Sequence, residues 1–241
     1  MKFQYNQVRV VLPILFGLLL TNTAIADLEN SIQFQPPPES EQPKNTEGAA
    51  SRQLGECTVN DLESTQSATE ELSSITALVP QNNYGLTTRK YPNFWIYVPD
   101  TSAKRAILSI KEVGKTPHWQ QSVDLNQQQG IVGIGLSEDA PALEIGKNYQ
   151  WAVTLVCSDR PSPNDPVVTS WIKRVEENNS QLLSTSKLDR VSAYAQQGIW
   201  YDALCILISE KSTQDNWQDL WNEYLKSVNL TKFADQPVIE R

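Results

Sequence analysis

Short apolar runs alternate with turn-forming residues between residues 75 and 177, at intervals of roughly 8 to 15 residues. In NYQWAVTLVC, for example, Tyr149, Trp151 and Val153 occupy alternate positions and therefore share one face of a strand. Seven such runs predict a mainly β fold, an antiparallel β-sandwich like an immunoglobulin or fibronectin type III domain. The runs are TALVP, NFWIYV, RAILSIKEV, WQQSVDL, GIVGIGL, NYQWAVTLVC and VVTSWIKRV.

The turn before the sixth run adds to this prediction. In LEIGKNYQWAV, Leu143, Gly146 and Tyr149 are spaced as in fibronectin type III and related sandwiches. Tyr149 is therefore predicted to form a tyrosine corner, in which its hydroxyl bonds to the backbone a few residues upstream.

The pattern becomes helical after residue 177. Ser186 and Asp189 fit the start of a first helix, and Gly198 fits its end. One apolar stripe then has helical spacing; it comprises Trp217, Leu220, Trp221, Tyr224, Leu225 and Val228. We predict a three-helix segment over residues 178–241. Because AYAQQGIWYDALCIL resembles a tetratricopeptide helix pair, and one and a half such units are too few to stand alone, we expect this segment to pack on the sandwich.

The N-terminus has the pattern of a secretory signal peptide. Lys2 and Arg9 precede the apolar stretch VVLPILFGLLL, and Ala24 and Ala26 give a small-x-small cleavage site. The apolar stretch is shorter than the ~20 residues that span a bilayer. We therefore predict cleavage of residues 1–26 after Ala26, no stable membrane span afterwards, and an exported protein in the periplasm or outside the cell.

Residues 27–74 are rich in Pro, Gln, Glu and Ser and hold few branched apolar side chains. Such a segment buries too little surface to offset the entropy lost on ordering, so we predict a disordered linker. The predicted domains are thus a signal peptide (1–26), a linker (27–74), a sandwich (75–177) and a helical segment (178–241).

Three cysteines, Cys57, Cys157 and Cys205, bear on the compartment. An exported chain meets an oxidising environment, which favours one disulfide. Cys205 lies in the apolar helical stretch ALCILI, where a buried free thiol behaves as a small hydrophobe. We therefore favour a Cys57–Cys157 disulfide, and the alternative is that all three thiols are reduced.

Two aromatic clusters are candidate partner-binding sites. In RKYPNFWIYVP, Trp95 and Tyr97 alternate with aliphatic residues and so occupy the strand face opposite the core. They are either exposed for a partner, as Trp and Tyr at interfaces often are, or covered by the C-terminal helices or the Cys57 segment. Trp200, Tyr201 and Asp202, which follow Gly198, are the second candidate cluster. Their alternative role is to cap and fill the helical core.

Charge and motifs limit the possible chemistry. The formal net charge of −8 becomes −10 without residues 1–26, which disfavours nucleic acids and anionic lipids as partners. His118 is the single histidine and lies in a predicted turn. No HExxH, CxxC, GxSxG or Walker motif occurs, so we predict no cofactor, metal site or catalytic residue. A carboxylate-based hydrolase or calcium site in the predicted loops stays open as an alternative; the loop carboxylates are Glu138, Asp139, Glu144, Asp159 and Asp165.

Four stretches together resemble the family known as domain of unknown function 928, exported proteins found mostly in cyanobacteria. They are TALVPQNNYGLTTRKYPNFWIYVP, APALEIGKNYQWAVTLVC, WIKRV and AQQGIWYDAL, and the resemblance covers residues 78–230. It implies no activity and no catalytic residues. We therefore expect a non-catalytic exported protein-interaction module of the cell envelope, whose partner is an envelope protein. The alternative is a carbohydrate-binding or carbohydrate-cleaving β-sandwich.

Overall fold

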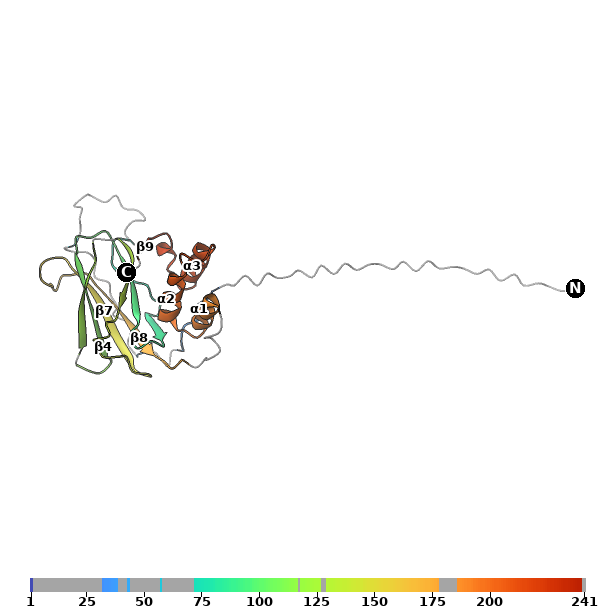
Figure 1. The fold of residues 1–241 in the computed structure, drawn as a ribbon, viewed down its shortest axis with the longest axis horizontal. Coiled ribbons are helices and arrows are strands. Elements are labelled where there is room, and N and C mark those ends of the chain that lie inside the picture. Colours follow the sequence, from blue (N-terminus) through green and yellow to red (C-terminus); the bar gives the residue numbers. More distant parts are fainter. Residues whose placement is uncertain are drawn as a thin grey trace.

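The computed structural model describes Met1 and residues 32–38, 43, 57, 72–116, 118–126, 129–177 and 186–239. Strands come first along these residues, and helices follow (Figure 1). The strands are β1 (Thr76–Ala77), β2 (Tyr84–Thr87), β3 (Asn93–Val98), β4 (Arg105–Glu112), β5 (His118–Asp124), β6 (Gly130–Gly135), β7 (Asn148–Val156), β8 (Val167–Arg174) and β9 (Val238–Ile239). The helices are α1 (Lys187–Gln196), α2 (Trp200–Ser209), α3 (Trp217–Lys226) and the 3-10 turn η4 (Thr231–Phe233).

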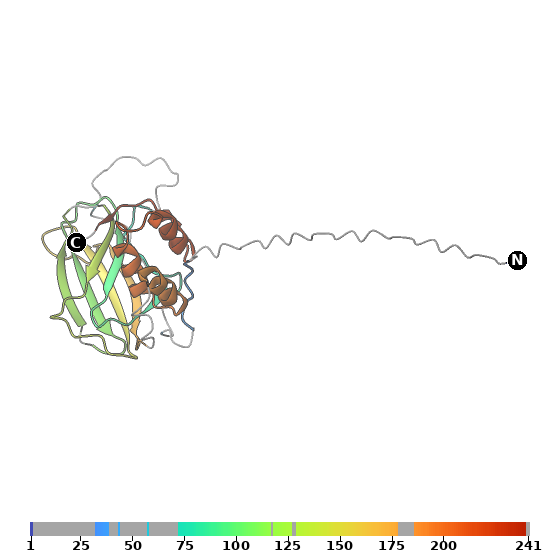
Figure 2. The same ribbon diagram turned by 45° about the vertical axis from the view of Figure 1, so that its right-hand side comes forward.

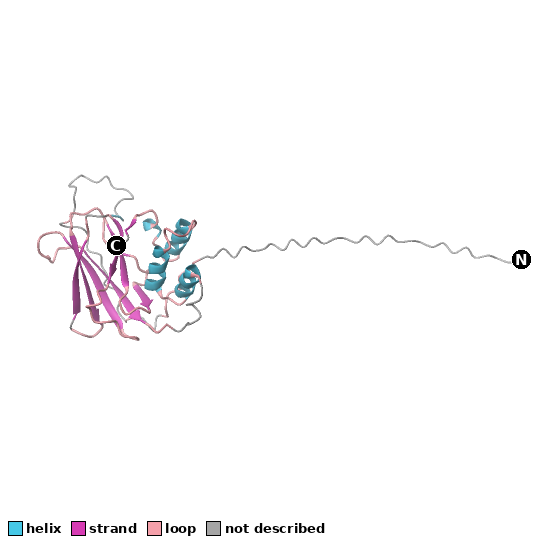
Figure 3. Ribbon diagram, in the orientation of Figure 1, coloured by secondary structure: helices cyan, strands magenta, loops and turns pink. Residues whose placement is uncertain are grey.

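The described strands form two sheets with the helices at one side (Figure 3). The four-stranded sheet has the order β1-β3-β6-β9, and the five-stranded sheet has the order β2-β8-β7-β4-β5. The predicted mainly β fold with helices at the C-terminus is therefore confirmed. A purely antiparallel sandwich is wrong, because the edge strands β2 and β9 pair in parallel with β8 and β6. Both reach their neighbours over long connections, which parallel pairing requires.

The core between the sheets follows from the alternation seen in the sequence. In β7, Tyr149, Trp151 and Val153 are buried, while the residues between them are half-buried. The Trp151 ring lies 4.9 Å from that of Phe94 in β3, which joins the two sheets.

Strand β3 is buried on both faces. Phe94 faces the five-stranded sheet, whereas the Tyr97 ring packs 5.0 Å from Phe233 of η4. Trp95, on the same face as Tyr97, lies over Gly133, where a Cβ atom would come within 2.7 Å of the indole ring. A strand covered on both faces has a continuous apolar sequence, and this accounts for NFWIYV. The helices therefore pack on β3, and through Tyr201 of α2 they also reach Trp151 in the five-stranded sheet.

The helices and the sheets share one hydrophobic core among the described residues. The chain also returns from the helices to the four-stranded sheet through β9. Residues 186–239 are therefore not a separate helical unit. Within the described residues, no helix combines the length and the apolar character needed to cross a membrane.

Part of the predicted linker is ordered. Residues 32–38, which we call the arm, run along the helices as the blue segment in Figure 2. Ile32 and Phe34 are 1% and 7% exposed, so the prediction of a disordered linker is wrong for the arm. The predicted signal peptide and its cleavage site after Ala26 lie outside the described residues, apart from Met1.

Candidate peptide-binding groove

The five predicted partner-binding residues are all buried. Trp95 is 7% exposed, and the other four are at most 2% exposed. The other four are Tyr97, Trp200, Tyr201 and Asp202. Their predicted role as a contact surface is therefore wrong for this conformation. The alternative holds instead, because η4 covers Tyr97 and the first residues of α2 are part of the core.

Trp200 and Tyr201 fix the start of α2 to the sandwich. The Trp200 indole N–H donates a hydrogen bond of 2.8 Å to the Leu78 carbonyl oxygen. The Tyr201 hydroxyl accepts a hydrogen bond of 2.7 Å from the Trp151 indole and donates one of 3.0 Å to the Trp171 carbonyl. Burial raises the pKa of Tyr201 far above its ordinary value. Both rings are thus held by bonds to strands or to the loop before β2.

Asp202 joins α2 to the segment that follows β2. Its carboxylate accepts hydrogen bonds of 3.0 Å and 3.2 Å from the Thr88 backbone N–H and hydroxyl. It also forms an ion pair of 3.2 Å with Arg89. Burial raises the pKa of Asp202, although hydrogen bonds from Thr87 and Thr88 and the charge of Arg89 act against this. Asp202 therefore has a structural role, and it links two of the stretches that carry the family resemblance.

The arm binds across the ends of the three helices. The Phe34 backbone N–H donates to Ser227 Oγ at 3.2 Å, at the end of α3. The Gln35 backbone N–H donates to the Ala195 carbonyl at 3.0 Å, in the last turn of α1. Ile32, Phe34 and Pro37 are buried, and the other arm side chains are exposed. The helices thus hold the arm by its main chain and by alternate side chains, as proteins hold extended peptides.

Phe34 packs against one ring of a stacked aromatic pair. The Phe34 ring meets Trp200 edge-on, with 5.0 Å between centroids. Trp200 in turn stacks on Tyr224 of α3 at 4.9 Å and 13°. Ser227, which binds the arm, donates to the Tyr224 carbonyl at 2.7 Å and is held in place by this bond. Helix α2 therefore contacts the Phe34 ring, and the end of α3 binds the Phe34 main chain.

Gly198 brings the arm close to the turn between α1 and α2. It has φ = +72°, a conformation that favours glycine. A Cβ atom here would lie 2.9 Å from Pro37 Cδ, so a side chain would collide with the arm. We call the surface made by Ala195, Gly198, Trp200, Tyr224 and Ser227 the arm groove.

Sequence reasoning assigned Gly198 to a helix end and missed the arm. Only a short sequence pattern indicated the arm: Ile32 and Phe34 stand at alternate positions in a polar segment, shortly before three prolines. Alternation of this kind is typical of an extended chain with one buried side.

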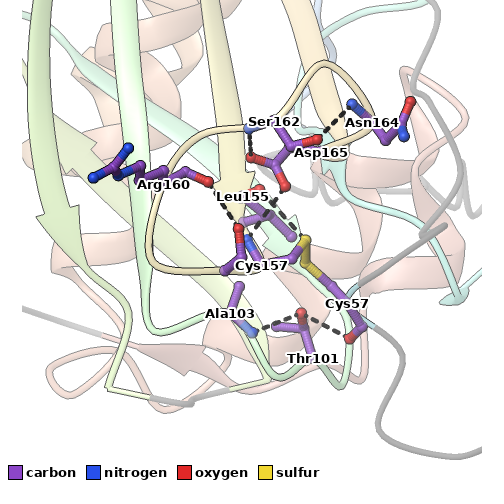
Figure 4. Close-up of a disulfide and its surroundings, with 10 residues drawn as sticks. Cys57, Thr101, Ala103, Leu155, Cys157, Arg160, Ser162, Asn164 and Asp165 are labelled. Atoms are coloured by element: carbon purple, nitrogen blue, oxygen red, sulfur yellow. Dashed lines mark hydrogen bonds between the residues drawn. A yellow bond between two sulfur atoms is a disulfide. The ribbon is translucent and has the colours of Figure 1, made fainter.

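The disulfide Cys57–Cys157 is present, which confirms the predicted pairing (Figure 4). The Cys57 carbonyl accepts hydrogen bonds from the Thr101 hydroxyl at 3.2 Å and the Ser102 N–H at 3.1 Å. Asp165 is buried and accepts the Ser162 N–H at 2.7 Å, so this loop carboxylate closes a turn. Cys57 is thus fixed to the sandwich by its disulfide and by its carbonyl oxygen.

Cys205 is a free thiol, as predicted, but it is half-buried and not fully buried. It accepts a hydrogen bond of 3.3 Å from the Asn93 side chain. Together with Trp95, Gly133 and Ile208 it lines a hollow of about 510 Å³ beside the four-stranded sheet.

The remaining predicted residues do not converge on a reaction centre. The Tyr149 hydroxyl accepts a hydrogen bond of 3.0 Å from the Glu144 N–H, as a tyrosine corner should. His118 is exposed at the start of β5, and Glu144 pairs with Lys147 at 2.7 Å. In the part of the chain that the structure describes, no group of three or more His, Cys, Asp or Glu side chains is arranged to hold a metal ion.

Three comparisons place the chain among known proteins. The family model described as Domain of Unknown Function (DUF928) matches residues 47–238. A comparison with the curated proteins finds no match. Among solved structures, the chain is similar to the fn3 domain of the human collagen alpha-1(XX) chain. The two share 8% identity with a TM-score of 0.27, over 41% of this chain and 87% of that chain, which is too weak a likeness to support an argument. Because the family match covers both sheets and all three α-helices, the chain belongs to the Domain of Unknown Function (DUF928) family.

Proposed function

We propose that the chain is a non-catalytic, exported protein-interaction module of the cell envelope that binds extended peptide segments in the arm groove. The observation that carries this proposal is the arm itself. It is held through two main-chain hydrogen bonds and through the buried side chains of Ile32, Phe34 and Pro37, and main-chain bonds combined with buried side chains are a general means of peptide recognition. The partner would be an envelope protein.

Two features support a fibronectin III-like sandwich as the scaffold of this module. The order β1-β3-β6 in one sheet and β8-β7-β4-β5 in the other corresponds to the ABE and GFC strands of such sandwiches, with one strand added beside C. The hydrogen bond from the Glu144 N–H to the Tyr149 hydroxyl is a second shared feature.

The pairing of α1 with α2 around Gly198 supports a tetratricopeptide-like helical segment. In tetratricopeptide repeats such helix pairs stack and build an extended concave binding surface. Here the pair is completed by α3, whose Tyr224 and Ser227 form one side of the arm groove.

The disulfide supports export. Disulfides form and persist in oxidising compartments such as the periplasm, and they are rare where thiols are kept reduced. The predicted signal peptide, residues 1–26, points to the same compartment.

Affinity capture from envelope extract tests the proposal. The bait is the mature chain with Ile32→Ser and Phe34→Ser, the released-arm variant, in which the buried anchors of the arm are removed. The matched control carries Gln33→Ser and Gln35→Ser, because these side chains are exposed. We expect the released-arm bait to retain a protein that a free peptide of residues 30–39 displaces.

Two results would contradict the proposal. One is that no protein retained by the released-arm bait is displaced by the peptide. The other is that a glycan array binds the mature chain and the peptide leaves that binding unchanged, which would favour the carbohydrate-binding alternative.

A further inference from the structure

We propose that the arm is an internal competitor for the arm groove, and that partner proteins carry an aliphatic residue, an aromatic residue two positions later and a proline three positions after that. This inference rests on the proposed function, because it names the ligand class and the regulation of the same site. The pattern follows the arm residues Ile32, Phe34 and Pro37.

The arm has the features of a bound ligand. It adopts neither helix nor strand, and its backbone N–H groups at Phe34 and Gln35 donate to the ends of α3 and α1. Its remaining residues, Gln33, Gln35, Pro36 and Pro38, are exposed. A partner segment of the same pattern would make the same contacts.

Two side-chain contacts and the burial of Ile32, which is 1% exposed, define the pattern. The Phe34 ring meets the Trp200 ring edge-on, and Trp200 is held by stacking on Tyr224, an arrangement that suits an aromatic side chain. Pro37 approaches Gly198 so closely that only a residue without Cβ fits beneath it. Main-chain bonding fixes the direction of the segment, whereas the side-chain pockets select its sequence.

The arm can leave without opening a covalent ring. The disulfide closes the loop from Cys57 to Cys157, and the arm precedes that loop. Eighteen residues separate Pro38 from Cys57, and a chain of that length spans at most about 60 Å. The body of the protein therefore keeps its covalent closure when the arm is displaced.

The family match includes the arm groove but not the arm. The match covers residues 47–238, which include every residue of the arm groove, whereas the arm at residues 32–38 lies before it. The groove thus lies inside the family match, and the arm lies outside it.

Tethering sets the strength of the competition. A tether of eighteen residues gives a local concentration of about 1 mM. If the free arm binds with a Kd of about 10 to 100 µM, the tethered arm raises the apparent Kd of a partner by about 10- to 100-fold. The intact chain would then respond only to a partner that binds more tightly than the arm, or to removal of the arm.

Fluorescence anisotropy with a labelled peptide of residues 30–39 tests this inference. It compares the full mature chain, the released-arm variant and the control with Gln33→Ser and Gln35→Ser. We expect the released-arm variant to bind the peptide about 10- to 100-fold more tightly than the other two. A peptide with Phe34→Ser should bind none of them.

Each contrary result has a distinct meaning. Equal affinity for the full chain and the released-arm variant would refute the competition and leave the groove as a peptide site. No binding by a folded released-arm variant would refute both the competition and the proposed function.

A second variant covers the case in which the released-arm variant does not fold. It carries a specific protease site in place of residues 44–50 and is cut after folding. We expect the labelled peptide to replace the cut arm. Retention of the cut arm against excess peptide would show that it is a fixed part of the core, and would overturn the proposal.

Discussion

Replacing Gly198 by alanine should destabilise the chain more than the same replacement at Gly146. Both glycines have positive φ angles, +72° and +81°, where an L-residue costs about 1 to 2 kcal/mol. They differ in their surroundings, because a Cβ at Gly146 meets no atom within 4 Å and a Cβ at Gly198 would lie 2.9 Å from Pro37 Cδ. The comparison therefore isolates the contact with the arm.

The size of the difference follows from the overlap. The Pro37 atoms belong to a rigid ring, so the arm must shift as a unit or leave, and overpacking of this kind costs about 1 to 3 kcal/mol. Gly198→Ala should then cost about 2 to 5 kcal/mol in total, against about 1 to 2 kcal/mol for Gly146→Ala. For a chain of this length the excess corresponds to a difference in Tm of about 2 to 12 °C.

Urea unfolding of both variants measures this difference, and a third background identifies its source. In the released-arm variant the arm no longer occupies the groove, so Gly198→Ala should cost no more than Gly146→Ala. Equal costs in the wild-type background would refute the close contact. An excess that persists in the released-arm background would show that something other than the arm meets the new side chain.

Three further predictions concern the scaffold. Replacing Cys57 and Cys157 together by serine should lower the free energy of unfolding by about 4 to 5 kcal/mol, because the bond closes a loop with a separation of 100 residues; calorimetry showing a loss below about 1 kcal/mol would contradict this loop-closure value. The pKa of Asp202 is higher in the folded state than its ordinary value of 3.8. Protonation of Asp202 therefore stabilises the folded wild type at low pH, and this contribution is lost as the pH rises through the raised pKa. The free energy of unfolding of the wild type, relative to that of Asp202→Asn, should therefore increase as the pH falls from 7 to 4. Urea unfolding that gives the same difference at both pH values would count against this prediction. Tyr149→Phe should lower the free energy of unfolding, measured with urea, by about 0.5 to 1.5 kcal/mol, the usual contribution of one hydrogen bond. An unchanged urea midpoint would show that the tyrosine corner does not stabilise the fold.

Local patterns predicted the elements that depend on local contacts. The predicted helix start at Ser186 is correct, since its hydroxyl accepts the Asp189 N–H at 3.1 Å. The apolar stripe of the last helix is buried, from Trp217 to Leu225. The tyrosine corner spans only five residues, so its spacing was visible in the sequence. Such features need no knowledge of the distant chain.

Features that depend on distant partners were not predictable in this way. The period of two in NFWIYV assigns Trp95 and Tyr97 to one face, but it does not say that η4 and α2 cover that face. The arm is the clearest case, because its groove partner Ser227 lies 193 residues from Phe34. Composition alone predicted that the arm is disordered, because composition does not reveal contacts with residues far away in the sequence.

The arm groove should keep its shape when the arm leaves. Trp200, which contacts Phe34, is tied to the Leu78 carbonyl through its indole N–H, and its neighbour Tyr201 is bonded to the sandwich on two sides. Asp202 adds an ion pair and two hydrogen bonds to the segment after β2. None of these bonds involves the arm. Since a preformed site avoids the cost of ordering its own side chains on binding, the free energy of arm contacts is available for selecting one segment over another. Under the proposed function, the buried aromatic residues that the sequence suggested as a contact surface serve binding indirectly, by fixing the groove in which the arm lies.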